Sequence, residues 1–182
     1  MRVYIVRHGK AVDADEGSLA DFDRTLTERG HAQAEFLAAR LVAGGAEFRP
    51  EVMLSSRYPR AIQTARAMQA ALGCELAVER GLEVDHPIGE AIELIEREHR
   101  AGRKSVMLVG HNPQLGELIA VLASGLAPQE MILKTGEMVA LDVKPSRLIG
   151  SAKIVGRLRM GTDKNDESIM GGVFAIVTGG RR

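Results

Sequence analysis

The sequence predicts an α/β fold: a three-layer α/β/α sandwich with a mostly parallel central sheet and an antiparallel C-terminal edge. Short uncharged apolar runs at residues 3–6, 52–54 and 105–109 are typical of strands buried on both faces. Stretches with the apolar spacing of amphipathic helices separate these runs, which is the pattern of a parallel sheet. Beyond residue 125 the pattern turns to β, so we expect the antiparallel strands to come last.

Composition indicates one globular domain spanning residues 1–182. Lys plus Arg and Asp plus Glu number 24 each, and this balance argues against a nucleic-acid binder driven by overall charge. Cys74 is the only cysteine, which rules out an intrachain disulfide and a cysteine-based zinc site. The chain enters an apolar strand almost at once, without the pattern of a secretory signal, and no apolar run approaches the ~20 residues of a membrane span. We therefore expect a cytoplasmic protein that binds neither nucleic acid nor membrane.

Local signals mark the ends of the first two expected helices. Thr27 can cap a helix over residues 27–42, because its hydroxyl can accept a hydrogen bond from the first turn. Pro59 suits the first turn of a second helix over residues 59–72, and Gly73 suits its end.

The rest of the chain is predicted in the same way. A third helix is expected over residues 89–101, and a fourth opens with Asn112 as its cap and Pro113 as its first residue. Residues 76–87 are expected to be irregular. The later expected features are strands at 137–143 and 148–158, a charged loop at 163–168 and a short strand at 173–177.

Polar side chains follow three of the buried strands directly. Arg7-His8-Gly9 ends the first strand, Ser56 follows the second with Arg60 in the next helical turn, and Gly110-His111 ends the third. In an open α/β sheet, ligands bind beyond the carboxyl ends of the strands. If the three strands are neighbours, two arginines and two histidines therefore meet at one place.

This set of side chains suits phosphoryl chemistry. The forked, permanently charged guanidinium groups of Arg7 and Arg60 match a tetrahedral phosphate. A neutral imidazole beside them can attack phosphorus, and a second, protonated one can stabilise the transferring group. Arg60 lies near the positive end of a helix dipole, so we expect an anionic group beside it. The helix that opens at Pro113 would add its amides to the same anion, and no metal ion or cofactor is needed.

Three sequence blocks resemble the histidine phosphatase (phosphoglycerate-mutase-like) superfamily. They are RHG at 7–9, RAIQTA at 60–65 and VGHNP at 109–113, and LTERG at 26–30 and KTG at 134–136 also look like that family. The short spacing between the blocks, with no inserted cap domain, resembles the SixA-type phosphohistidine phosphatases. The resemblance covers about residues 1–143.

The resemblance implies a role for each block. His8 would be the nucleophile that becomes phosphorylated, and Arg7, Arg60 and His111 would form the phosphate pocket. Arg60, within RAIQTA, would be the pocket arginine, while Arg57 would lie at the rim or in solvent.

Three further residues are expected to contact substrate. Gly9 would permit close approach of the backbone to the phosphate. Lys10 follows the RHG block and either contacts a substrate oxygen or faces solvent. Asn112 follows His111 and is a third candidate for substrate binding.

The general acid is less well marked than the nucleophile. Glu83 matches the glutamate of the wider family by its spacing from Arg60, and Asp85 is a second choice. SixA-type proteins show no clear counterpart of that glutamate. An imidazole leaving group is easily protonated near neutral pH and needs less help than an alkoxide.

Other polar residues have ordinary interpretations. The acidic loop over residues 10–24 is expected to be solvated, with a charged rim that repels the wrong anions or meets a basic partner as the alternative. His31 and His99 are expected on helix surfaces, and His86 either touches substrate or does not take part. Cys74 is expected to be a structural thiol.

Three functions fit these patterns. The leading one is a metal-independent phosphohydrolase that acts through a phosphohistidine intermediate, with phosphohistidine on a signalling protein, such as the phosphotransfer domain of a histidine kinase, as substrate. The second is a phosphatase for a small phosphomonoester, such as a sugar phosphate or nucleotide. The third is a phosphate- or phosphoprotein-binding module without turnover.

Overall fold

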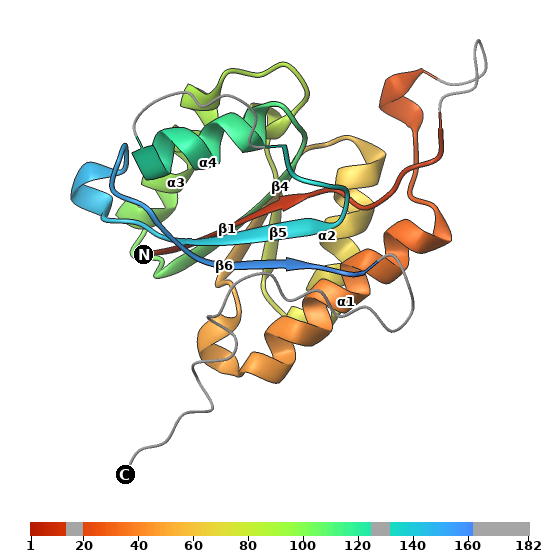
Figure 1. The fold of residues 1–182 in the computed structure, drawn as a ribbon, viewed down its shortest axis with the longest axis horizontal. Coiled ribbons are helices and arrows are strands. Elements are labelled where there is room, and N and C mark those ends of the chain that lie inside the picture. The colour runs from red at the N-terminus through yellow and green to blue at the C-terminus, as the bar shows by residue number, and fades with distance from the viewer. Residues whose placement is uncertain (14–19, 125–131, 162–182) are drawn as a thin grey trace.

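A computed structural model describes residues 1–13, 20–124 and 132–161, and these form an α/β fold around one twisted sheet (Figure 1). The described strands lie in the order β3-β2-β4-β1-β5-β6. The first four run parallel, β5 is antiparallel to β1, and β6 is antiparallel to β5. Their bounds are β1 Arg2–Arg7, β2 Val52–Ser55, β3 Glu75–Val78, β4 Ser105–Gly110, β5 Glu137–Asp142 and β6 Lys153–Arg159. The predicted sheet, mostly parallel with an antiparallel C-terminal edge, is confirmed.

Helices cover both faces of the sheet and complete three layers (Figure 1). The α-helices are α1 Glu28–Gly44, α2 Pro59–Leu72, α3 Ile88–Arg100 and α4 Gln114–Ser124. Short 3₁₀ turns join them: η1 Asp21–Asp23, η2 Ala46–Phe48, η3 Arg80–Leu82 and η4 Pro145–Arg147. None of the described helices is long and apolar enough to cross a bilayer.

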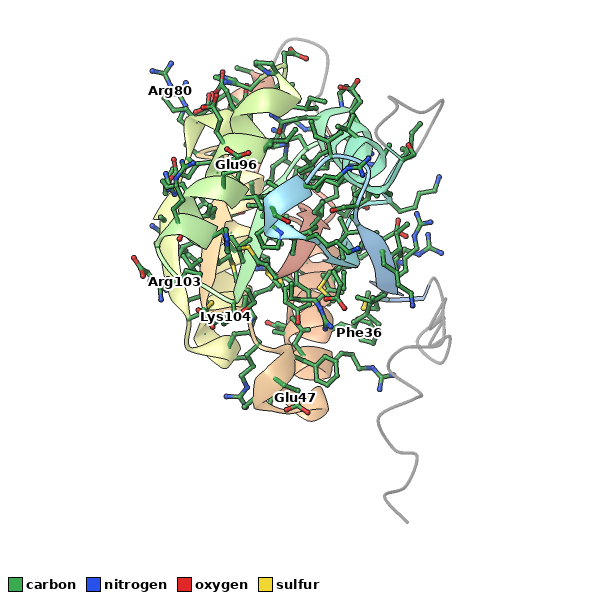
Figure 2. All side chains as sticks on the ribbon, turned by 90° about the vertical axis from the view of Figure 1, so that its left-hand side faces the viewer. Phe36, Glu47, Arg80, Glu96, Arg103 and Lys104 are labelled. Atoms are coloured by element: carbon green, nitrogen blue, oxygen red, sulfur yellow. The ribbon has the colours of Figure 1, made fainter. Side chains whose placement is uncertain are left out.

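Alternation along β1 divides the core into two parts. Val3 and Ile5 pack with side chains of α3 and α4, whereas Tyr4 and Val6 pack with those of α1 and α2. Successive side chains of a strand point to opposite faces, so a strand covered on both faces is apolar throughout. All four of these residues are fully buried. Charged side chains such as Arg80, Glu96 and Arg103 lie on the outside (Figure 2).

Thr27 and Gly73, which were predicted to begin the first helix and to end the second, do so in the structure. The Thr27 hydroxyl accepts a hydrogen bond from the Gly30 amide, and Gly73 adopts the left-handed conformation that ends α2. The fourth helix differs, because it begins at Gln114 and not at Pro113. The Asn112 side chain is not its cap: Nδ2 donates to the Leu133 carbonyl at 2.8 Å.

Two expectations about strands were wrong in detail. Residues 75–78, expected mostly as an irregular segment, form edge strand β3, which pairs in parallel with β2. Its half-exposed residues carry no strong apolar pattern, so pairing with β2 sets its conformation. The strand expected over 148–158 begins only at Lys153, after the turn η4. The expected loop at 163–168 and strand at 173–177 lie outside the described residues.

The order of the strands brings the three polar strand ends together. Strand β4 lies between β1 and β2, and Arg7 is in register with Gly110 while Ser55 is in register with Val109. The ladder continues one residue further, where the His8 amide donates to the Gly110 carbonyl at 3.1 Å. The three strands therefore end at one level of the sheet, which is the condition for a shared site.

Candidate active site

A cavity of about 370 Å³ opens at this end of the sheet. It contains the four residues on which the sequence prediction depends, from the ends of β1 and β4 and the first turn of α2. The residues that line it are Arg7, His8, Lys10, Ala11, Asp21, Arg24, Arg60, Val84, His111, Asn112 and Thr135. Arginines and histidines thus meet in one concave site.

His8 lies at the floor of the cavity and is held in one tautomer. Its Nδ1 is 2.7 Å from the Gly9 carbonyl oxygen, which can only accept, so Nδ1 carries the proton. The other ring nitrogen, Nε2, therefore keeps a free lone pair. Burial, opposed by the Gly9 bond but reinforced by Arg60 and Arg7, lowers the pKa of His8 to about 4. The imidazole is neutral at pH 7 and can act as a nucleophile.

His111 lies beside His8, with 5.1 Å between the ring centroids. Its Nε2 is 2.9 Å from the Ser56 hydroxyl, which in turn accepts from the Tyr58 amide. Burial, then His8 and Arg60, lower the pKa of His111 to about 2. A phosphate dianion among these groups would favour the protonated form, so charging of His111 is coupled to anion binding.

The two arginines approach the floor from different elements. The Arg7 Nη1 donates to the Leu133 carbonyl at 2.7 Å, which fixes the side chain at the end of β1. Arg60 is only 4% exposed, and its guanidinium lies over the Tyr58 ring. Both cations lie close enough to act on the pKa of His8, so they contribute positive charge where a phosphate would bind.

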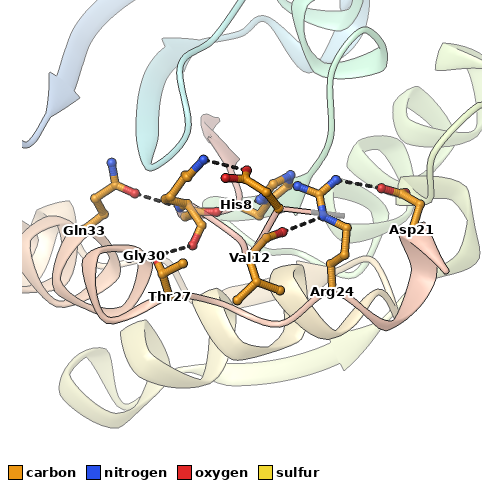
Figure 3. Close-up of polar contacts among 10 residues, drawn as sticks. His8, Val12, Asp21, Arg24, Thr27, Gly30 and Gln33 are labelled. Atoms are coloured by element: carbon orange, nitrogen blue, oxygen red, sulfur yellow. Dashed lines mark hydrogen bonds and ion pairs between the residues drawn. The ribbon is translucent and has the colours of Figure 1, made fainter. Parts of the chain in front are cut away.

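The anion expected beside Arg60 is the carboxylate of Asp21. Arg60 Nη2 donates to Asp21 Oδ2 at 2.9 Å, and Arg60 Nη1 donates to the Asp21 carbonyl at 2.5 Å. Arg24 Nη1 donates to the other carboxylate oxygen at 2.8 Å, while Arg24 Nε holds the Val12 carbonyl (Figure 3). These ion pairs outweigh burial and lower the pKa of Asp21. The acidic loop was expected to be solvated, but its residue Asp21 lines the cavity and binds Arg60.

Sequence reasoning did not identify Asp21 and Arg24 individually as site residues. Both belong to or follow the turn η1, which no periodic pattern predicts. The available signal was Arg24, two residues before the LTERG block begins at Leu26, in a loop otherwise rich in acids. Asp15 and Glu16 of the same loop lie outside the described residues.

The predicted substrate-binding residues fall in different places. Lys10 and Asn112 line the cavity, although the Lys10 ammonium pairs with Asp13 at 2.8 Å. Gly9 is not among the lining residues, and the structure gives it another role. A Cβ there would lie 2.5 Å from the Gly30 carbonyl oxygen, so the glycine permits close packing of the strand end against α1.

Glu83 is buried next to the site but does not line it. Its Oε1 lies 2.7 Å from Nε of Arg57, and the neighbouring Val84 faces the cavity instead. Asp85 is exposed, in the left-handed conformation. Arg57 is half-exposed and lies over the Phe22 ring, at the rim. A role for Glu83 as general acid stays a prediction.

The loop before β5 closes one side of the site. The Gly136 amide donates to the His8 carbonyl at 2.9 Å, and the Glu137 carboxylate accepts from the Lys134 amide at 2.6 Å. Glu137 is itself buried and paired with Arg157 of β6. The antiparallel edge of the sheet thus holds in place the loop that presents Thr135 to the cavity.

Three buried polar atoms of cavity-lining residues have no hydrogen-bond partner within the described part of the chain. They are Arg7 Nε, His111 Nδ1 and Asn112 Oδ1. Buried polar groups are normally paired, so this cluster of unpaired atoms fits a site that binds a polar ligand. His31 and His99 are exposed, as expected, and His86 pairs with Glu90 at 2.9 Å.

Comparisons with known proteins agree with the fold. Residues 3–86 match the family model described as histidine phosphatase superfamily (branch 1). An uncharacterized protein of Picosynechococcus sp. is 34% identical over 149 residues, which cover 81% of this chain and 88% of the relative.

Solved structures are similar over most of the chain. A protein histidine phosphatase SixA bound to tungstate is 24% identical with a TM-score of 0.74, covering 87% of this chain and 97% of that one. A candidate phosphohistidine phosphatase SixA from Agrobacterium tumefaciens is 30% identical with a TM-score of 0.68, covering 86% and 97%. A mycobacterial glucosyl-3-phosphoglycerate phosphatase is 18% identical with a TM-score of 0.67, covering 84% and 96%.

The chain belongs to the histidine phosphatase superfamily. It is SixA-like in structure, and it is a phosphatase. Among its structural neighbours, one is described as a protein histidine phosphatase and another as a glucosyl-3-phosphoglycerate phosphatase.

Proposed function

We propose that this phosphatase removes the phosphoryl group from phosphohistidine on a protein, through a phosphohistidine intermediate on His8. The observation that carries the mechanism is the tautomer of His8. Its Nδ1 proton is committed to the Gly9 carbonyl, and Nε2 is neutral and free in a cavity rich in arginine. In the first step Nε2 would attack phosphorus, and in the second, water would release phosphate.

The remaining floor residues would bind and stabilise the transferring group. Arg7 and Arg60 would hold the phosphoryl oxygens, and His111 would become charged as the dianion enters. Lys10 and Asn112 would contact the substrate at the wall of the cavity. Electrostatic stabilisation of this kind needs no metal ion, so we expect EDTA to leave the rate unchanged.

The form of the rim supports a protein substrate. Phe22 is 38% exposed beside Asp21, and Ile132 is 57% exposed beside Leu133, whose carbonyl binds Arg7. These two exposed apolar side chains, each next in sequence to a residue of the site, are available for contact with another protein surface, which a small sugar phosphate would not use. The SixA neighbours are described as phosphohistidine phosphatases, which agrees with this choice. A cytoplasmic phosphotransfer domain is the partner that we propose.

The substrate is tested by comparing kcat/KM for a phosphorylated phosphotransfer domain with a panel of sugar phosphates and nucleotides. We expect the domain to exceed every metabolite by about two orders of magnitude, and the His8→Ala variant to turn over neither class. A metabolite with the higher kcat/KM would favour the small-molecule phosphatase instead. Binding of the domain without turnover by the wild type would favour a binding module.

A further inference from the structure

Asp21 is an unusual component of a phosphate site. Of the described residues that line the cavity, it alone carries a carboxylate, among Arg7, Lys10, Arg24 and Arg60. Its side chain is 55% exposed, whereas His8 is 7% exposed at the floor. A carboxylate at the mouth repels the phosphoryl group. It holds Arg60 and Arg24 in place, and its exposure also leaves it accessible to a positively charged group of the substrate.

The exposure of Asp21 puts it on the side of the cavity from which a leaving group would depart. In phosphoryl transfer the attacking and leaving atoms lie roughly in line through phosphorus. Because His8 attacks from the buried floor, the leaving group must lie on the opposite side of phosphorus, toward the mouth. Asp21 is held there by Arg60 and Arg24, at 2.9 and 2.8 Å.

The neighbouring side chain adds an apolar ring surface. Phe22, on the same turn, contacts the Tyr58 ring at 4.8 Å, and Tyr58 contacts the His111 ring at 4.9 Å. A row of rings thus runs from the floor to the exposed edge of Phe22. The Arg57 guanidinium already lies over the Phe22 ring, and the ring is 38% exposed beyond that contact. A carboxylate beside such a ring is suited to a flat group that carries positive charge and an N–H donor.

We propose that Asp21 determines specificity for N-phosphoryl substrates by accepting the N–H of a protonated imidazole leaving group, with Phe22 beside the ring. This inference rests on the proposed function and names a residue for its selectivity. A phosphorylated imidazole carries its proton on the nitrogen that is not bonded to phosphorus. The Asp21 carboxylate accepts that N–H and holds the ring in its cationic form.

The chemical step then balances without proton transfer to the departing atom. The lone pair of His8 Nε2 forms the new bond to phosphorus, the P–N bond of the substrate breaks, and its electron pair returns to the imidazole nitrogen. The imidazole leaves neutral, because its proton stays on the other nitrogen. Its attraction to Asp21 falls as its charge disappears, which favours release.

The hydrogen bonds between Asp21 and Arg60 hold both side chains in place before substrate arrives. Asp21 uses both Nη atoms of Arg60, and an entering phosphoryl group competes for them. As Arg60 turns to the phosphoryl oxygens, the Asp21 carboxylate becomes available to the leaving group. A substrate whose leaving group has no N–H gains nothing from this exchange.

The test compares kcat/KM for phosphoimidazole with that for p-nitrophenyl phosphate, whose leaving group carries no N–H. Asp21→Asn keeps the shape of the side chain and removes its charge. Asp23→Asn is the matched control, since Asp23 lies on the same exposed turn and does not line the cavity. We expect D21N to lower the ratio of the two kcat/KM values at least about tenfold, the worth of a charge-assisted hydrogen bond.

The two substrates should also respond in opposite directions. In D21N, hydrolysis of p-nitrophenyl phosphate should rise by roughly twofold to fivefold, because Arg60 loses a competing anion. Equal changes of kcat/KM for both substrates in D21N would overturn the inference. They would show that Asp21 only competes with the phosphoryl group for Arg60. An equal fall of the ratio in D23N would overturn it too, in favour of a general field effect.

Failure of the proposed function would look different. A wild type that hydrolyses p-nitrophenyl phosphate but not phosphoimidazole would reject both the N-phosphoryl substrate and the assignment of Asp21. A wild type that hydrolyses both, with a ratio unmoved by D21N, would reject the assignment of Asp21 alone.

Discussion

The floor and the mouth of the cavity are built in different ways. At the floor, His8 and His111 follow directly from neighbouring strands, are almost fully buried, and are fixed by a backbone carbonyl and a buried hydroxyl. At the mouth, Asp21 lies on a short 3₁₀ turn and Arg24 directly follows it, and ion pairs with a half-exposed carboxylate mainly hold them. From this difference we propose that the floor carries the chemistry common to all substrates, and that the mouth selects among them.

After the loss of His8 itself, the largest effect should come from a floor arginine. Arg60→Gln removes one of the two guanidinium groups, and the loss of such a charged donor should lower kcat/KM by about 10²–10³-fold. Because the floor binds the phosphoryl group itself, both p-nitrophenyl phosphate and phosphoimidazole should lose at least this factor, and phosphoimidazole should lose somewhat more because Arg60 also holds Asp21. Steady-state kinetics on both substrates make the measurement.

Arg66→Gln is the matched control for this prediction. Arg66 lies on the same helix but is exposed and does not line the cavity, so its loss should change neither rate more than about twofold. A loss below about tenfold in Arg60→Gln, or a loss confined to one substrate, would break the division between floor and mouth.

Burial of the floor predicts how stability depends on pH. The pKa of His8 is about 4 in the fold and about 6.5 in the unfolded chain, so the unfolded state binds more protons between these values. The free energy of unfolding therefore falls as the pH drops from about 6.5 to about 4, by up to about 1.4 kcal/mol per pH unit for this group. Above pH 6.5 the contribution of His8 is fully present.

Urea unfolding at pH 7.5 and pH 5.0 tests this prediction. Wild type should lose about 2 kcal/mol more than His8→Asn between the two conditions, since Asn does not titrate. His31→Asn, at an exposed position on α1, should keep the pH dependence of the wild type. Parallel losses in His8→Asn and wild type would show that His8 is not desolvated as its burial implies.

A smaller effect is expected beside the mouth, at Glu83. If Glu83 serves as general acid, Glu83→Gln should slow hydrolysis of a sugar phosphate, which has an alkoxide leaving group, about tenfold and that of phosphoimidazole by less than about twofold. Its ion pair with Arg57 and its absence from the cavity lining limit the expected loss. Should Asp85→Asn show this pattern and Glu83→Gln not, Asp85 would be the acid.

The floor could be predicted from sequence because each of its elements has a local signal. An uncharged apolar run followed by Arg7 and His8 identifies both the strand and its functional end, and Pro59 fixes the helix that presents Arg60. These residues then lie close together in a parallel sheet, provided that their strands are neighbours. The sequence could not show that these strands are neighbours, and the structure shows it, because β4 lies between β1 and β2.

The mouth had no comparable signal. The position of Asp21 depends on a single 3₁₀ turn and on two long arginine side chains, and neither has a sequence period. Strand β3 was missed for a similar reason, since its conformation comes from pairing with β2. Gly9 packs closely against Gly30, which is distant in sequence, and such a contact has no local sequence signal. We therefore expected a substrate role for Gly9 and did not predict this packing role.

The central claim, that His8 Nε2 takes the phosphoryl group, is tested most directly by trapping the enzyme during turnover. Wild type mixed with phosphoimidazole is quenched rapidly in alkali, where phosphohistidine survives, and its peptides are mapped by mass spectrometry. We predict one phosphoryl group on the peptide that contains His8, and none on His8→Asn. A phosphoryl group on another residue, or turnover by His8→Asn at the wild-type rate, would contradict the claim.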